Sequence, residues 1–196
     1  MSRVEIIGLT GGIGAGKSVV ARILRTKGIP VYDCDLRAKS IMEESEEIIC
    51  KLKDRFGEEC YHPAGNLNRK LLADRIFSSD EERKWLNALV HAAVKEDIIS
   101  WRDQNSEASV IFVESAILHT SRLDELCSRI WLVEAPEDIR FQRAMDRGGI
   151  SAENLKARME TQKMEFDSLP AEKLDRIDNS GRFSVLSQID SLCRQY

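Results

Sequence analysis

The chain has 196 residues, a formal net charge of −4, 42% hydrophobic residues and 32% charged residues. This length suits one α/β domain with an insertion, and the acidic balance argues against a nucleic-acid partner, which would favour a basic surface. The five cysteines are dispersed without metal-like spacing, and no apolar run approaches the length of a membrane span. We therefore expect a cytoplasmic protein with reduced thiols and no membrane partner.

The most informative pattern lies near the N-terminus. Residues 11–18 spell Gly-Gly-Ile-Gly-Ala-Gly-Lys-Ser, which matches G-x-x-x-x-G-K-[ST], the phosphate-binding P-loop, and residues 4–9 predict a strand before it. In such a loop the backbone N–H groups face an anion, the lysine reaches the β- and γ-phosphates, and the serine hydroxyl binds Mg²⁺. The pattern predicts a nucleoside triphosphate site, with Mg²⁺ at the serine, formed by Gly12, Gly14, Ala15, Gly16, Lys17, Ser18 and Val19.

Helical and strand patterns alternate along the rest of the chain. A second short strand ends at Asp33, and residues 36–105 then place apolar residues at helical spacing, which predicts a helical insertion. Apolar runs at residues 109–114 and 129–133 are typical of buried parallel strands. The remaining elements are two helices, a weak strand and a closing helix, expected over residues 136–147, 151–166, 174–178 and 185–192.

This alternation indicates an α/β fold with a parallel sheet and right-handed crossovers. We expect a nucleotide-binding core in residues 1–35 and 106–196, with the helical insertion in residues 36–105. Gly148 and Gly149 interrupt a helix and mark the start of a lid segment, which we expect over residues 147–168.

Kinases, GTPase switches and mechanical ATPases all use a P-loop. The chain lacks the N-K-x-D box of a GTPase, and its small size and helical insertion favour a small-molecule kinase. Such an enzyme needs a group that orients and helps deprotonate the attacking hydroxyl, and Asp33 lies at the carboxyl end of a strand, where ligands gather. Two other carboxylates each keep two interpretations. Asp35 supports a Mg²⁺-bound water or caps a helix, and Glu114 holds such a water or contacts the P-loop.

Positive charge for the moving phosphoryl group is expected on the helix that begins at Pro136. Arg140, Arg143 and Arg147 recur at i, i+3 and i+7, which places them on one helical face just before the glycine pair. Because the planar guanidinium grips two phosphate oxygens, we assign phosphate contacts to Arg143 and Arg147. Arg140 remains open between a phosphate contact and a solvated surface residue.

Four stretches of the sequence, the P-loop among them, are distinctive. They are the P-loop with its flanks (residues 8–18), Asp-Cys-Asp-Leu-Arg-Ala (33–38), Leu-Asn-Ala-Leu-Val-His (86–91) and Ile-Asp-Asn-Ser-Gly (177–181). Together they resemble the dephospho-CoA kinase family. The resemblance implies a P-loop kinase fold like that of adenylate kinase, with a five-stranded parallel sheet flanked by helices, a helical CoA-binding insertion and a lid.

The resemblance also implies an activity, the ATP-dependent phosphorylation of the 3′-hydroxyl of dephospho-CoA, which completes coenzyme A biosynthesis. It implies that Asp33 is the base or the carboxylate that orients the hydroxyl, and that Lys17 and Arg143 are catalytic, with Arg143 stabilising charge. It also implies that Asn179 and its neighbours line the adenine pocket, while Arg147 belongs to the ATP site. The acceptor-binding residues that it implies, besides Asp33, are Asn68, Arg69, Leu86 and His91. The expected partners are ATP and dephospho-CoA, and the expected assembly is a monomer or a weak homo-oligomer.

Two alternatives remain at this level. A nucleoside or nucleoside-monophosphate kinase shares the loop, the sheet and the lid, although the long insertion and residues 86–91 count against it. A non-catalytic nucleotide-dependent switch has no need of a carboxylate beside the acceptor, so Asp33 counts against that second alternative.

Overall fold

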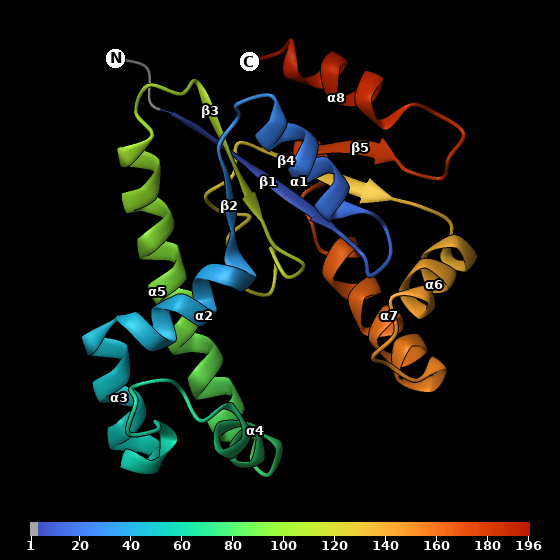
Figure 1. The fold of residues 1–196 in the computed structure, drawn as a ribbon. Helices are drawn as coiled ribbons and strands as arrows, with labels where there is room; N and C mark the ends of the chain where they lie inside the picture. Colours follow the sequence, from blue (N-terminus) through green and yellow to red (C-terminus); the bar gives the residue numbers. More distant parts are fainter. Residues whose placement is uncertain (1–3) are drawn as a thin grey trace. The chain divides into compact units, whose positions relative to one another are not determined.

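The computed structural model describes residues 4–196, which include a parallel sheet of five strands (Figure 1). The strands lie in the order β2-β3-β1-β4-β5, and all of them are parallel, as the apolar runs predicted. Their bounds are Glu5–Gly11 for β1, Val31–Asp33 for β2, Val110–Glu114 for β3, Arg129–Glu134 for β4 and Leu174–Asp178 for β5. Because all pairs are parallel, the carboxyl ends of the strands meet at one edge of the sheet, and the P-loop leaves β1 at that edge.

One face of the sheet is covered by α1 (Lys17–Thr26) and α8 (Val185–Cys193). Val20, Ala21 and Leu24 of α1 and Ile189 of α8 are buried in one cluster with β-strand residues. The fully buried rings of Phe112 and Trp131 are part of this cluster and meet edge to face, with centroids 4.6 Å apart. This packing fixes α1, and with it the P-loop, against the central strands.

The opposite face of the central strand is covered by the segment that follows β3. Gly8 in β1 permits this close approach, because a Cβ atom there would lie 2.7 Å from Cδ1 of Leu118 and 3.2 Å from Sγ of Cys127. The segment after β3 therefore lies directly on the sheet.

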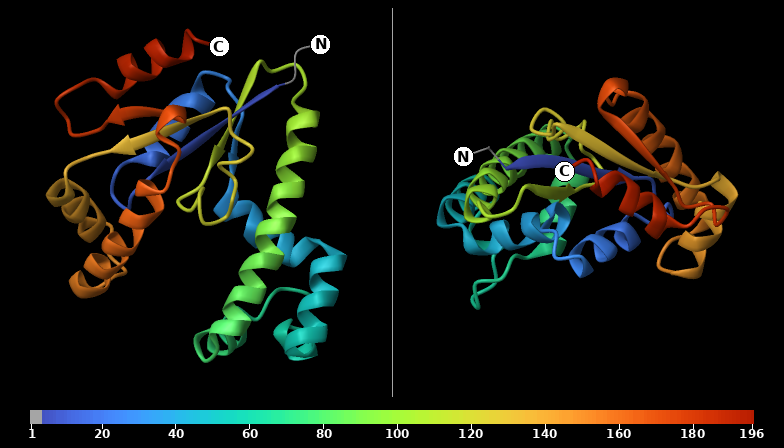
Figure 2. Two further views of the ribbon diagram at one scale, coloured as in Figure 1. Left: turned by 180° about the vertical axis from the view of Figure 1, so that it is seen from behind. Right: turned by 90° about the horizontal axis from the view of Figure 1, so that it is seen from above.

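Two helices, α6 (Glu137–Asp146) and α7 (Ala152–Asp167), lie side by side (Figures 1 and 2). Gly148 and Gly149 turn the chain between them, with φ values of 72° and 82° that other residues rarely adopt. The two helices share a small apolar cluster, to which the P-loop contributes Ile13. The segment expected to form the lid therefore contacts the P-loop through the side chain of Ile13.

The chain divides into two compact units. The first contains the described residues up to Asp33 together with Trp101–Tyr196, and the second is Cys34–Ser100. The sequence placed a helical insertion over residues 36–105. The compact unit has slightly different bounds and runs from Cys34 to Ser100.

The second unit is helical, as the spacing of its apolar residues predicted. Its helices are α2 (Cys34–Glu44), α3 (Glu46–Phe56), α4 (Arg69–Phe77) and most of α5 (Asp80–Gln104). Side-chain caps start two of these helices: Ser45 accepts the Ile48 N–H, and Asn68 accepts the Leu71 N–H. The long helix α5 buries Leu86, Val90 and Val94.

Among residues 4–196, no helix combines the length and the apolar composition needed to cross a bilayer. All five cysteines are free thiols, as the dispersed spacing predicted.

Candidate active site

The P-loop is shaped to bind an anion. Gly14 and Gly16 adopt φ values of 78° and 97°, in the left-handed region that favours glycine. Within the described part of the chain, the backbone N–H groups of Gly14, Gly16, Lys17 and Ser18 donate to no protein acceptor. Free donors on a tight glycine turn form a concave site for phosphate oxygens.

Helix α1 strengthens this site, because it begins at Lys17, directly after the loop. Its first turn contains no acidic residue, so the positive end of the helix dipole faces the loop without a local carboxylate. Ser18 is the second residue of the helix and is exposed, so its hydroxyl is accessible.

Lys17 is held at the end of β3. Its Nζ atom lies 3.0 Å from Oε1 of Glu114, whose other carboxylate oxygen is 3.6 Å from Nη2 of Arg25. Glu114 is only 6% exposed, so these two cations are what stabilise its charge in the interior. Of the two interpretations of Glu114, the structure shows the contact with the P-loop, through its ion pair with Lys17.

Asp33 is the last residue of β2 and lies beside Glu114 in the register of the sheet. Glu114 in turn lies beside Leu9 of β1, the strand that leads into the P-loop. The carboxylate predicted to act on the acceptor is therefore one strand from the residue that holds Lys17. Asp35 lies in the first turn of α2, where a negative charge favours the helix.

Asn179 joins three parts of the nucleotide site. Its side-chain Nδ2 donates to the Ala15 carbonyl oxygen of the P-loop at 2.7 Å, and its backbone N–H donates to Glu134 of β4 at 2.8 Å. Its own carbonyl oxygen accepts Nη2 of Arg143 at 3.1 Å. The φ value of 97° at Gly16 favours glycine, and a Cβ atom there would also collide with Nδ2 of Asn179.

The three arginines of the lid-entry region occupy different environments. Arg143 has one nitrogen, Nη1, that is buried without a hydrogen-bond partner among the described residues, an arrangement that favours an anionic ligand. Arg147 follows α6 as its C-cap and is exposed. A Cβ atom at Gly12 would collide with Nη1 of Arg140, so this guanidinium lies directly against the P-loop. The sequence did not decide between a phosphate contact and a solvated position for Arg140. The feature that indicated a role at the site was its helical spacing from Arg143.

A family model described as dephospho-CoA kinase matches residues 5–184. The chain belongs to the dephospho-CoA kinase family. Its relatives include the dephospho-CoA kinase of Porphyromonas gingivalis, which is 46% identical over 159 residues that cover 81% of this chain and 78% of the relative. Membership in the family makes the chain an enzyme with dephospho-CoA kinase activity, the final step of coenzyme A biosynthesis.

Solved structures agree with this fold. A Thermus thermophilus protein superposes with a TM-score of 0.78 at 30% identity and covers 99% of this chain, which spans 98% of that protein. The dephospho-CoA kinase of Campylobacter jejuni superposes with a TM-score of 0.70 at 21% identity, over 97% of this chain and 96% of its own. The P-loop kinase fold predicted from sequence is confirmed.

In the dephospho-CoA kinase family the acceptor is an anionic nucleotide, and four residues of the second unit were assigned to it. Asn68 caps α4, and Arg69 forms an ion pair with Glu43 at 3.0 Å. Leu86 is 7% exposed and offers little surface to a ligand. His91 is half-buried, and this burial lowers the pKa of its imidazole below the usual value. The acceptor roles of these residues stay predictions.

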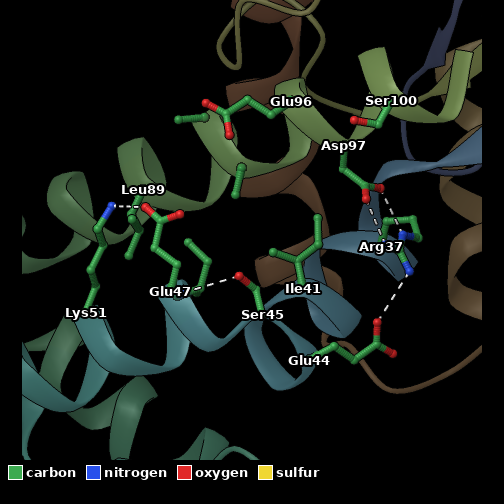
Figure 3. A pocket seen from close by; sticks show the side chains of 13 residues that line it. Arg37, Ile41, Glu44, Ser45, Glu47, Lys51, Leu89, Glu96, Asp97 and Ser100 are labelled. Carbon is green, nitrogen blue, oxygen red and sulfur yellow. Dashed lines mark hydrogen bonds and ion pairs between the residues drawn. The ribbon is translucent and has the colours of Figure 1, made fainter. Parts of the chain in front are cut away.

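The second unit also contains a cavity of about 430 Å³ between α2, α3 and α5 (Figure 3). Within it Arg37 donates to both carboxylate oxygens of Asp97, at 3.0 and 2.9 Å, and lies 3.6 Å from Glu44. Its lining has more carboxylates than cations: Glu44, Glu47, Glu96 and Asp97 against Arg37 and Lys51. This balance repels phosphate groups, so we do not assign the cavity to the diphosphate of the acceptor.

Proposed function

We propose that the P-loop of the first unit binds the ATP phosphates and that Asp33 orients the 3′-hydroxyl of dephospho-CoA for attack on the γ-phosphorus. The observation that carries this proposal is a set of four N–H groups in the P-loop and at the start of α1 that have no acceptor among residues 4–196. Such donors stabilise the negative charge of the phosphates without any rearrangement of the loop.

Asp33 supplies the group that receives the proton of the attacking hydroxyl. It lies at the carboxyl end of β2, in register with Glu114. A general base in this position raises the nucleophilicity of the hydroxyl as the bond to phosphorus forms. Lys17 stabilises the β- and γ-phosphates during the transfer, and its pair with Glu114 defines its position without a nucleotide.

Ser18 is the residue that would hold Mg²⁺. Among residues 4–196 there is no cluster of three or more His, Cys, Asp or Glu side chains arranged to hold a metal ion, and Glu114 is engaged by Lys17 and Arg25. A single accessible hydroxyl at the P-loop fits Mg²⁺, because this ion commonly takes one or two protein ligands and completes its shell with phosphates and water. When bound there, Mg²⁺ neutralises charge on the β- and γ-phosphates.

Arg143, Arg147 and Asn179 complete the proposed ATP site. Nη1 of Arg143, which has no partner in the described part of the chain, donates to a phosphate oxygen while Nη2 keeps its hydrogen bond to the Asn179 carbonyl. Arg147 approaches the phosphates when the lid segment closes over them. The second unit binds dephospho-CoA, with Asn68, Arg69, Leu86 and His91 as the proposed contacts, and the free thiols of the chain suit a reducing cytoplasm.

The test is a direct assay of acceptor choice. The purified protein is incubated with Mg·ATP and dephospho-CoA, with adenosine and AMP as parallel acceptors, and both ADP release and CoA formation are followed. ADP and CoA produced together only with dephospho-CoA support the proposal, and omission of Mg²⁺ should abolish turnover. Phosphorylation of adenosine or AMP instead would overturn the assignment of the acceptor.

A further inference from the structure

One peptide group in the P-loop is held at both of its ends. The Gly12 carbonyl oxygen accepts the N–H of Ala15 at 2.9 Å, and the N–H of Ile13 donates to Oε1 of Gln162 in α7, also at 2.9 Å. Because this carbonyl and this N–H belong to the same planar group, the two hydrogen bonds together determine its rotation.

The rotation of this group controls the shape of the loop beyond it. Gly12, on one side of the group, has no side chain that would hinder a rotation. A rotated group would release the Ala15 N–H and open the turn between Gly12 and Ala15. The next N–H groups, which face the phosphates, would then lose their convergent arrangement.

Gln162 is presented by a part of α7 that is itself fixed. On the next helical turn Glu165 is buried, at 7% exposed, and its carboxylate accepts the backbone N–H groups of His119 and Thr120 at 2.5 and 3.0 Å. It also accepts the Thr120 hydroxyl at 2.5 Å. The ring of Phe166 lies against Gly12, 3.4 Å from the place of a Cβ atom. These contacts give the amide oxygen of Gln162 a defined place beside the loop.

The side chain of Ile13 adds a second connection between the same two elements. It packs on the small cluster of Ala144, Leu155 and Met159, which joins α6 and α7. The backbone of Ile13 is thus bonded to α7 while its side chain is embedded between α6 and α7. The part of the P-loop that precedes its phosphate-facing N–H groups is therefore positioned by α6 and α7.

We propose that Gln162 is a positioning residue for ATP. It holds the Gly12–Ile13 peptide group in the orientation that presents the P-loop N–H groups to the phosphates, and it acts through the loop without contacting the nucleotide. The inference rests on the ATP site proposed above. A pre-formed loop favours the bound nucleotide equally in the ground state and in the transition state, so its loss should affect KM more than kcat.

The test compares two substitutions on the same helix. Gln162→Met keeps the length of the side chain and removes the acceptor, and Arg158→Met replaces an exposed side chain of the same helix. For Gln162→Met we expect the Kd and KM for Mg·ATP to rise about tenfold, with kcat and the KM for dephospho-CoA within about twofold of wild type. For Arg158→Met we expect a Kd and a KM for Mg·ATP within about twofold of wild type. If Gln162→Met does not fold, Gln162→Asn, which withdraws the acceptor from Ile13, is measured with the same expectations.

An unchanged Kd for Mg·ATP in the Gln162 variant would overturn the positioning role, and so would an equal rise in the Arg158 variant. Lys17→Ala is measured in parallel, because it tests the ATP site itself. If Lys17→Ala weakens ATP binding and the Gln162 variant does not, only the positioning role fails. If neither variant weakens ATP binding, the proposed ATP site fails.

Discussion

Lys17 and Glu114 form an ion pair, with Nζ and Oε1 3.0 Å apart, that joins the start of α1 to the end of β3. The lysine is 17% exposed and the glutamate side chain 7% exposed, so both charges depend on each other for stabilisation. This pair positions the P-loop lysine and explains why a carboxylate is placed in the interior at the end of an apolar strand.

Loss of Lys17 should therefore affect stability as well as activity. In Lys17→Ala the buried Glu114 keeps, among the described residues, Arg25 at 3.6 Å as its remaining cationic partner. We expect the free energy of unfolding to fall by about 2 kcal/mol and turnover to be lost. The double variant Lys17→Ala/Glu114→Gln, which removes the unpaired charge, should recover stability without activity. Chemical denaturation of the three proteins measures this, and a double variant no more stable than the single one would contradict it.

Asp33→Asn should separate binding from chemistry. The amide keeps the shape of the side chain but cannot accept the proton of the attacking hydroxyl, so we expect kcat to fall by about 10²- to 10⁴-fold. The Kd for Mg·ATP should stay within about twofold, because Asp33 lies on β2 and not in the P-loop. Steady-state kinetics measures kcat, and isothermal titration calorimetry with Mg·ATP measures the Kd. Near-normal turnover would remove Asp33 from the mechanism.

Arg143 should not be replaceable by lysine. One nitrogen of its guanidinium donates to the Asn179 carbonyl at 3.1 Å, while another is buried without a partner among residues 4–196. A single ammonium group cannot satisfy both directions, so we expect Arg143→Lys to lower kcat/KM for ATP by about tenfold or more. Arg158→Lys, at an exposed position of α7, is the matched control and should leave kcat/KM unchanged. Equal kinetics for the two variants would argue against a phosphate contact at Arg143.

His91 should make the protein sensitive to mild acid. Burial lowers the pKa of its imidazole in the folded state below the usual value of 6.5. The unfolded chain then binds a proton more readily, so stability is complete above pH 6.5 and declines as the pH falls through the window below it. His91→Asn removes the titrating group and should reduce this decline. Thermal unfolding between neutral and mildly acidic pH measures it, and identical pH profiles for both proteins would exclude His91 as the cause.

Local patterns in the sequence predicted the strands, the helical insertion and the P-loop. Each of these depends on neighbouring residues: a continuous apolar run indicates a buried parallel strand, and closely spaced glycines allow the turn around phosphate. The position of Asp33 at the end of a strand followed in the same way. The family resemblance rested on contiguous motifs as well, and the family model that matches residues 5–184 confirmed it.

Contacts between distant residues were decided only by the tertiary structure. Lys17 and Glu114 are 97 positions apart, and Ile13 and Gln162 are 149 positions apart. The sequence left two interpretations for Glu114, placed Arg140 on a helical face without a partner, and contained no signal for Gln162. Hydrogen bonds and ion pairs form within a few ångströms, and only the packing of the sheet, α6 and α7 brings these atoms within that range. The residue types that can bind ATP follow from the sequence, whereas their orientation follows from the fold.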